Sequence, residues 1–178
     1  MIKRRLIPSW TLPGLFLLIG ATTAPGRTME AGTLWVNGAF GPGLKLGEKV
    51  GGSDGFLMLN GGIEYSLSPS TSIVTDLDLG LASTSPCRLH AGARYRWTGL
   101  GTPFSPFTQL QLSAGTVFNA LGANLGLLGL RMSGGVDYFV TSRLSGGIVT
   151  HLELNTTLGE TSAFYGVSEW LVTTSYSF

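Results

Sequence analysis

Hydrophobic side chains recur at every second position over most of this sequence. In the segment that contains Ile73, Leu77 and Leu79, the positions between them include Asp76 and Asp78. Successive side chains of a β-strand point to opposite faces, whereas a helix repeats its faces about every 3.6 residues. The pattern therefore predicts strands that each have one apolar face and one face of polar, charged or very small residues.

Eight segments of the chain carry this alternation. Most of them are nine to fourteen residues long, which exceeds the length of an ordinary globular strand and suits a tilted strand that crosses a bilayer. The segments lie at residues 32–40, 56–67, 72–83, 88–98, 106–118, 127–140, 143–155 and 164–178.

The connections between these segments differ between the two ends of the predicted strands. Even-numbered connections are short or rich in Gly, Pro and Ser, and odd-numbered ones tend to be longer, although the third, Thr84–Cys87, is short. This alternation predicts an antiparallel up-and-down barrel whose two rims face different compartments. The even connections are Ser68–Thr71, Gly99–Ser105 and Thr141–Ser142, and the longer odd ones are Gly41–Gly55, Asn119–Gly126 and Thr156–Ala163.

Charge placement distinguishes two kinds of barrel whose strands would both alternate between apolar and polar side chains. A soluble barrel points its apolar face inward, and a membrane barrel turns that face to lipid and fills its lumen with polar groups. Only 12% of the residues are charged, against about 25% in soluble domains, and lysine is absent from every predicted strand. Arginine pairs with carboxylates and tolerates enclosure better than lysine does. We therefore predict an all-β fold, an eight-stranded antiparallel transmembrane β-barrel, whose lumen holds an ion-pair network of Glu64, Asp76, Asp78, Arg88, Arg94, Arg96, Arg131, Asp137, Glu153 and Glu169.

Aromatic residues gather near the ends of the predicted strands. Membrane barrels carry such residues as girdles at both bilayer interfaces. The sequence predicts one girdle at the even-connection rim, formed by Tyr65, Trp97, Phe107, Tyr138, Tyr176 and Phe178, and one at the opposite rim, formed by Phe40, Phe118 and Phe164.

The N-terminus has the layout of a targeting segment. Lys3, Arg4 and Arg5 precede the apolar stretch Trp10–Ala21, and small residues follow up to Gly26. This order of basic, apolar and small-residue regions is typical of a cleavable secretory signal peptide. We predict a signal peptide at residues 1–26 and a barrel domain at residues 27–178.

The last predicted strand ends on an aromatic residue. Trp170, Val172, Thr174, Tyr176 and Phe178 share one face, and Phe178 is the final residue given. This ending resembles the C-terminal signature of Gram-negative outer-membrane barrels, and the chain as a whole resembles small OmpA-like barrel-domain proteins. The resemblance implies localisation in the outer membrane, contact with its lipids, and recognition of Trp170, Tyr176 and Phe178 by the barrel-assembly machinery.

Two hairpins of the predicted barrel repeat each other. Gly61–Tyr65 matches Gly134–Tyr138, and Ile73–Leu79 matches Ile148–Leu154. In an eight-stranded barrel these hairpins lie diametrically opposite, so their polar residues could meet arginines across the lumen. The paired glycines would make local room for large neighbours.

Candidate catalytic and metal-binding residues are few. His151 and Glu153 share a face, but lipid A deacylases carry a His-x-Ser pair, and here Glu153 occupies the serine position. Asp76 and Asp78 face arginines rather than further metal ligands, and His90 lies among arginines as a lumen filler. We predict no catalytic site, no metal and no cofactor.

Cys87, the one cysteine, excludes an intramolecular disulfide. We place this thiol in a short external loop, as an inert group or as an intermolecular disulfide site.

The predicted function is that of a non-enzymatic outer-membrane barrel with a structural or surface-interaction role. The loops Pro42–Asp54 and Thr156–Ala163 would contact an unidentified extracellular partner. The net charge is +1, of which Lys3, Arg4 and Arg5 supply +3, so the remainder is slightly acidic and nucleic acid is excluded as a partner. The alternatives are a small pore with weak conductance, a lipid-modifying enzyme and a secreted soluble barrel.

Overall fold

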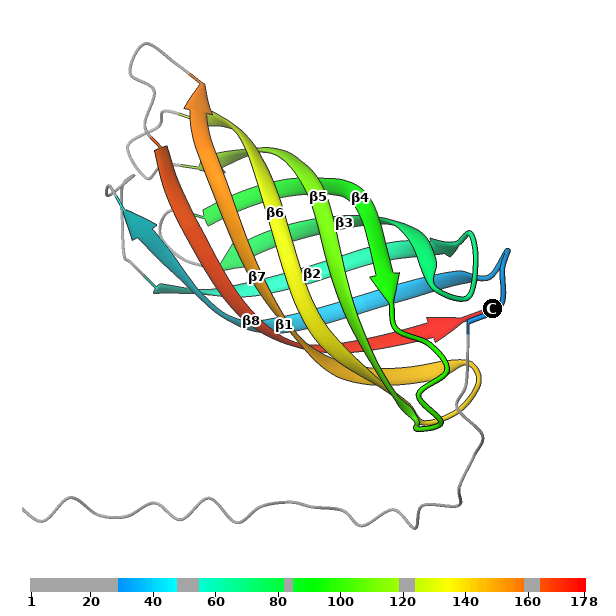
Figure 1. The fold of residues 1–178 in the computed structure, drawn as a ribbon. Helices are drawn as coiled ribbons and strands as arrows, with labels where there is room; N and C mark the ends of the chain where they lie inside the picture. Colours follow the sequence, from blue (N-terminus) through cyan, green and yellow to red (C-terminus); the bar gives the residue numbers. More distant parts are fainter. Residues whose placement is uncertain (1–28, 48–54, 82–84, 119–123, 159–163) are drawn as a thin grey trace, which may run out of the picture.

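Eight antiparallel strands close into a barrel in the computed structural model (Figure 1), which describes residues 29–47, 55–81, 85–118, 124–158 and 164–178. Each strand pairs with its neighbours in sequence, and β8 closes on β1. No helix in these ranges is long and apolar enough to cross a membrane. The strands are β1 (Leu34–Gly47), β2 (Gly55–Ser66), β3 (Thr71–Leu81), β4 (Ser85–Arg96), β5 (Phe104–Phe118), β6 (Asn124–Phe139), β7 (Leu144–Leu158) and β8 (Phe164–Ser177).

The three connections at one rim are described, and they are short. The β2–β3 turn is closed by Ser68, whose hydroxyl accepts a hydrogen bond from the Thr71 amide at 3.0 Å. The β6–β7 turn is closed by Thr141, whose hydroxyl accepts from the Leu144 amide at 2.9 Å. Serine and threonine favour such turns because their oxygens bind nearby backbone amides. The C-terminus and the segment that enters β1 lie at this same rim (Figure 1), which we call the turn rim.

The pairing that closes the barrel is interrupted near its middle. The β1–β8 ladder pairs Phe40 with Val172 and resumes where Gly43 pairs with Glu169. Gly41 and Pro42 lie in this gap on β1, and proline has no amide hydrogen to donate to a ladder. We call this β1–β8 junction the seam.

Several strands extend further toward the opposite rim, the loop rim, than the side-chain pattern predicted. Gly41–Gly47 belongs to β1 and Thr156–Leu158 to β7, although both segments were predicted to be loop. Backbone hydrogen bonding in a closed barrel continues whatever the side chains are, and Gly41 and Leu44 pair with Met58 and Gly55 on β2. Residues 48–54 and 159–163 of the two predicted loops lie outside the described residues, as does the predicted signal peptide.

The predicted position of Cys87 also needs correction. The structure places Cys87 inside β4, half-buried and paired with Leu79 of β3, and not in a loop. A Pro and a Ser before Cys87 hid the beginning of this strand in the sequence.

The outer surface is apolar and the interior is polar. On β3, Leu77 and Leu79 are 45% and 44% exposed, whereas Asp76 and Asp78 are 4% and 0% exposed. A continuous surface of leucine around buried charges requires lipid as the outer solvent. The chain is therefore a transmembrane β-barrel, and the alternative of a soluble barrel with an apolar core is wrong.

A dense aromatic girdle marks the turn rim. Its outward-facing residues include three contacting pairs, with ring centroids 5.5, 5.1 and 5.4 Å apart: Tyr95 with Trp97, Phe104 with Tyr138, and Tyr176 with Phe178. Tyr65 also faces outward there.

The predicted girdles need two corrections. Phe107 is only 2% exposed, because it faces the lumen. Phe40 lies midway along β1, since that strand continues to Gly47. Of the residues predicted for the loop rim, Phe164 faces outward there.

The paired glycines of the two repeated hairpins face opposite sides of the wall. A Cβ at Gly62 would lie 2.2 Å from Asp76 Oδ1, and one at Gly135 would lie 2.6 Å from Cζ of Phe107, so both glycines make room inside the barrel. A Cβ at Gly61 would meet nothing within 4 Å. The inner glycine of each pair is thus the one that packing requires.

Gly62→Ala is therefore expected to destabilise the barrel by about 1–3 kcal/mol, the usual effect of overpacking. The measurement is the temperature at which the folded band shifts on an unboiled gel. Gly61→Ala is the matched control, and it should leave that temperature unchanged. Equal effects of the two substitutions would contradict the packing argument.

Candidate functional site

The lumen is filled by charged side chains that converge from several strands, and three groups of contacts can be followed along the barrel. Nearest the turn rim, Glu64 of β2 accepts hydrogen bonds from Arg94 at 2.7 Å and from Arg96 through both of its oxygens. The Ser72 hydroxyl also donates to Glu64. Arg96 continues to Asp137 of β6 at 3.1 Å.

An aromatic ring supports this first group. The Arg94 guanidinium lies 4.4 Å from the centroid of the Phe107 ring, and that of Arg96 lies 5.7 Å from it. A cation over a ring face is attracted by the negative charge density there, more strongly where water is excluded. Phe107 therefore serves the ion-pair network rather than the membrane interface.

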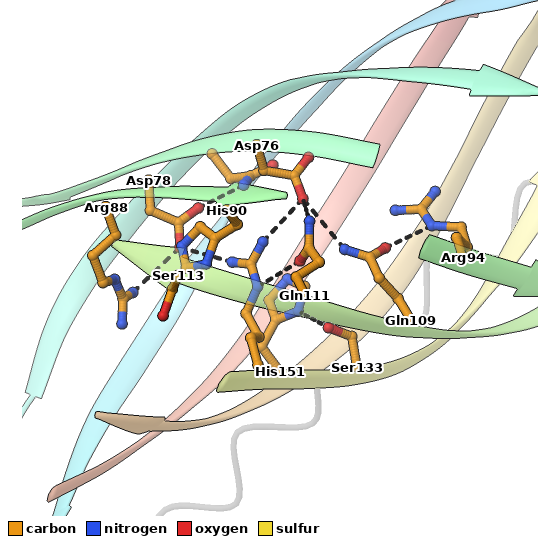
Figure 2. A network of polar contacts seen from close by, with 12 residues as sticks. Asp76, Asp78, Arg88, His90, Arg94, Gln109, Gln111, Ser113, Ser133 and His151 are labelled. Carbon is orange, nitrogen blue, oxygen red and sulfur yellow. Dashed lines mark hydrogen bonds and ion pairs between the residues drawn. The ribbon is translucent and has the colours of Figure 1, made fainter. Parts of the chain in front are cut away.

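The second group is centred on Arg131, and Figure 2 shows its members Asp76, Asp78, His90 and Gln111. The Arg131 guanidinium donates to Asp76 at 2.9 Å, to Asp78 at 2.8 Å and to Gln111 at 2.8 Å. His90 Nε2 lies 2.9 Å from Asp78 Oδ2. Each polar atom of the guanidinium fork thus meets an acceptor, an arrangement that suits arginine and not lysine.

The third group lies toward the loop rim and is centred on Arg88 of β4. Arg88 binds Glu153 at 2.6 Å, Asp78 at 3.3 Å, and Glu169. The Ser113 hydroxyl donates to Glu153 at 2.6 Å. Asp78 contacts both Arg131 and Arg88, so it joins the second group to the third.

The structure places all ten residues predicted for the lumen in the interior, each 9% exposed or less. It brings every one of them into at least one ion pair. Six carboxyl groups face four guanidinium groups, so the formal net charge of these residues is −2.

Sequence reasoning overlooked the uncharged members of the network. Gln109 links the first two groups, because its amide oxygen accepts from Arg94 at 2.7 Å and its nitrogen donates to Asp76 at 3.3 Å (Figure 2). Gln111 donates to Asp76 at 2.7 Å. Both glutamines alternate with leucines along β5. This alternation was the sequence signal that could have assigned them to the lumen.

Apolar clusters close the interior on both sides of the ion pairs, and neither was predicted. At the turn rim, Met29, Trp35 and Phe139 are buried together, and the Trp35 and Phe139 rings meet edge to face at 5.9 Å. A larger cluster extends from the middle of the lumen toward the loop rim, and its members are Phe56, Met58, Phe107, Val117, Leu127, Val149, Tyr165, Val167 and Leu171.

His151 has a serine neighbour after all, from the adjacent strand. Ser133 Oγ lies 2.6 Å from His151 Nδ1 (Figure 2), while Glu153 binds Arg88 and Ser113 instead of approaching His151. A hydroxyl beside an imidazole is the geometry of an activated nucleophile. However, Ser133 and His151 are only 7% and 4% exposed, and the cavity that His151 lines measures about 20 Å³. The pair is therefore enclosed inside the barrel.

Metal-binding chemistry has no candidate in the described part of the chain. No group of three or more His, Cys, Asp or Glu residues is arranged to hold a metal ion there. The carboxylates of the lumen are directed to arginines.

Of the predicted C-terminal signature, Trp170 and Tyr176 lie on the outer surface of β8, and Phe178 follows the last residue of that strand. Trp170, Tyr176 and Phe178 are 45%, 45% and 78% exposed. They would face lipid in the closed barrel.

Comparison with solved structures finds the same architecture in outer-membrane proteins. Neisserial surface protein A superimposes with a TM-score of 0.62 at 17% identity, over 83% of this chain and 98% of that one. The N-terminal barrel of Pseudomonas aeruginosa OprF gives 0.61 at 13% identity, over 83% and 98%. Ail, the attachment invasion locus protein of Yersinia pestis, gives 0.52 at 9% identity, over 83% and 99%. No protein-family model matches the sequence, and no curated protein does. These likenesses establish the fold.

Proposed function

We propose that this chain is an outer-membrane protein of a Gram-negative bacterium, related in architecture to small OmpA-like barrels, with a structural or surface-interaction role and no open channel. Its neighbours among the solved structures are outer-membrane barrels that superimpose on most of this closed barrel. Two of them are named for a surface or attachment role, which supports a role at the cell surface.

The observation that carries the proposal is the filled lumen. Three groups of ion pairs occupy its middle, and apolar side chains pack at both ends. An eight-stranded barrel leaves an interior just wide enough for side chains. The interior acts as a core that braces the wall, and this favours a closed barrel over the alternative of a weakly conducting pore.

The alternative of a lipid-modifying enzyme would need a nucleophile that lipid can reach. Among the described residues, Ser133 and His151 are the one serine and histidine found in contact. Both side chains are buried inside the barrel, away from lipid. We therefore propose a non-enzymatic role.

Three partners complete the proposal. The leucine surface would contact outer-membrane lipid, and β8 would be read by the barrel-assembly machinery through Trp170, Tyr176 and Phe178. The loop-rim connections, which lie largely outside the described residues, would carry the contact with an extracellular partner.

The test combines localisation with electrical measurement. We expect the protein in the outer-membrane fraction, in a folded form whose gel band shifts on boiling. After reconstitution in a planar bilayer, the purified barrel should give no resolvable single-channel step. Recovery from the soluble periplasmic fraction would overturn the localisation, and regular conductance steps would overturn the closed lumen in favour of the pore.

A further inference from the structure

A small cavity lies inside the barrel against the seam. It has a volume of about 20 Å³, and its lining includes Asn37 of β1, Thr173 of β8, Asp76 and Asp137. The seam side chains that line the cavity, such as Ala39 and Ser175, are small, whereas the four arginines of the network project from β4 and β6. The cavity therefore lies between these small seam side chains and the Arg94 side chain.

Two polar side chains beside this cavity have no hydrogen-bond partner in the described part of the protein. Asn37 is 9% exposed, and neither its Oδ1 nor its Nδ2 is bonded. The buried Thr173 hydroxyl also has no hydrogen-bond partner among the described residues. Buried polar atoms are nearly always paired with protein or with ordered water. The amide and the hydroxyl thus call for an occupant that can both donate and accept.

The charges around the cavity restrict what that occupant can be. The carboxylates of Asp76 and Asp137 disfavour an anion. Both carboxylates are already paired, with Arg131 and Arg96, so the cavity does not need a cation to balance their charge. A site for one water requires about 10–15 Å³ and two to four polar partners. The observed volume provides for one such molecule.

We propose that the seam cavity is a binding site for a single water molecule, held by the Asn37 amide and the Thr173 hydroxyl. The site bridges β1 and β8 from the inside, because Asn37 and Thr173 belong to the two strands that close the barrel. It lies close to the place where the β1–β8 ladder is interrupted at Gly41 and Pro42. Asn37 pairs with Ser175 and Thr173 pairs with Ala39 in the β1–β8 ladder. The water thereby adds a side-chain link inside the barrel to the backbone pairing beside the gap.

A high-resolution crystal structure of the purified barrel tests the site directly. We expect a solvent peak within about 2.7–3.2 Å of the Asn37 amide and the Thr173 hydroxyl. A parallel crystal soaked in rubidium chloride distinguishes water from a cation. A cavity without a peak at hydrogen-bond distance, or an anomalous rubidium peak in it, would overturn the proposal.

Asn37→Leu gives a second test, whose sign depends on the water. If water bonds the amide, the substitution removes a satisfied group and leaves Thr173 unpaired, so the gel-shift temperature should fall by about 4 °C. If the amide has no partner, its removal should leave that temperature unchanged or raise it, and the proposal fails. Thr150→Val, on the lipid-facing surface, is the control and should cause no shift. Should Asn37→Leu not assemble, the wild-type crystal still decides.

Discussion

Replacing Arg88 by methionine is expected to lower the free energy of unfolding by about 3–5 kcal/mol, the effect of leaving buried charges without their partner. Arg88 is 1% exposed and binds Glu153, Glu169 and Asp78. Methionine keeps much of the volume but none of the donors, so two of these carboxylates lose their only arginine. The measurement is urea unfolding of the barrel in detergent micelles, followed by tryptophan fluorescence.

Two further variants separate charge imbalance from lost packing. Arg88→Met combined with Glu153→Gln and Glu169→Gln removes the unpaired charges together with the arginine, and it should recover a large part of the loss, because coupled residues do not add. Arg143→Met, at the exposed β6–β7 turn, should change the free energy by no more than about 0.5 kcal/mol. If Arg88→Met were as mild as Arg143→Met, the ion pairs would contribute nothing to the fold.

Placing an arginine on the lipid-facing surface should have the second large effect. Leu112 is 70% exposed and lies near the middle of β5, between Ala91 and Leu130 of the adjacent strands. Leu112→Arg is expected to destabilise the barrel by about 2–4 kcal/mol, because a charge at the bilayer midplane loses its hydration. Urea unfolding in lipid vesicles measures this loss.

The matched control for that substitution lies at the end of a strand. Leu158 is the last residue of β7 and is 52% exposed. Leu158→Arg should cost about 0–1 kcal/mol, because a side chain near the interface can reach water. In a water-soluble barrel both substitutions would be nearly neutral, so a flat response at both positions would contradict a lipid-facing exterior.

Parity along the strands made much of the lumen predictable from the sequence. Arg88 and Glu153 both alternate with leucines, and this was enough to assign them to one interior. The choice of partner was not predictable, because Arg88 and Glu153 are 65 residues apart and meet only through the tilt and stagger of a closed barrel.

The errors arose where another property was given more weight than parity. Phe107 was assigned to the aromatic girdle because it lies near a strand end. It is two residues from Gln109 and so shares the inward face of β5, whereas Leu110 is on the outward face. The first strand was ended too early because Gly41 and Pro42 resemble a turn. In the structure that segment continues to pair with β2, so backbone geometry prevailed over local preference.

An even number of strands brings both ends of the chain to one rim, where Trp35 pairs with Ser177. A reporter joined just before β1 is therefore presented on the same side of the membrane as a reporter joined just after β8. Only an insertion between β1 and β2, β3 and β4, β5 and β6, or β7 and β8 is presented on the opposite side (Figure 1). The point of attachment alone thus decides on which side of the membrane an added segment lies. Segments at the turn rim and at the loop rim can be changed independently.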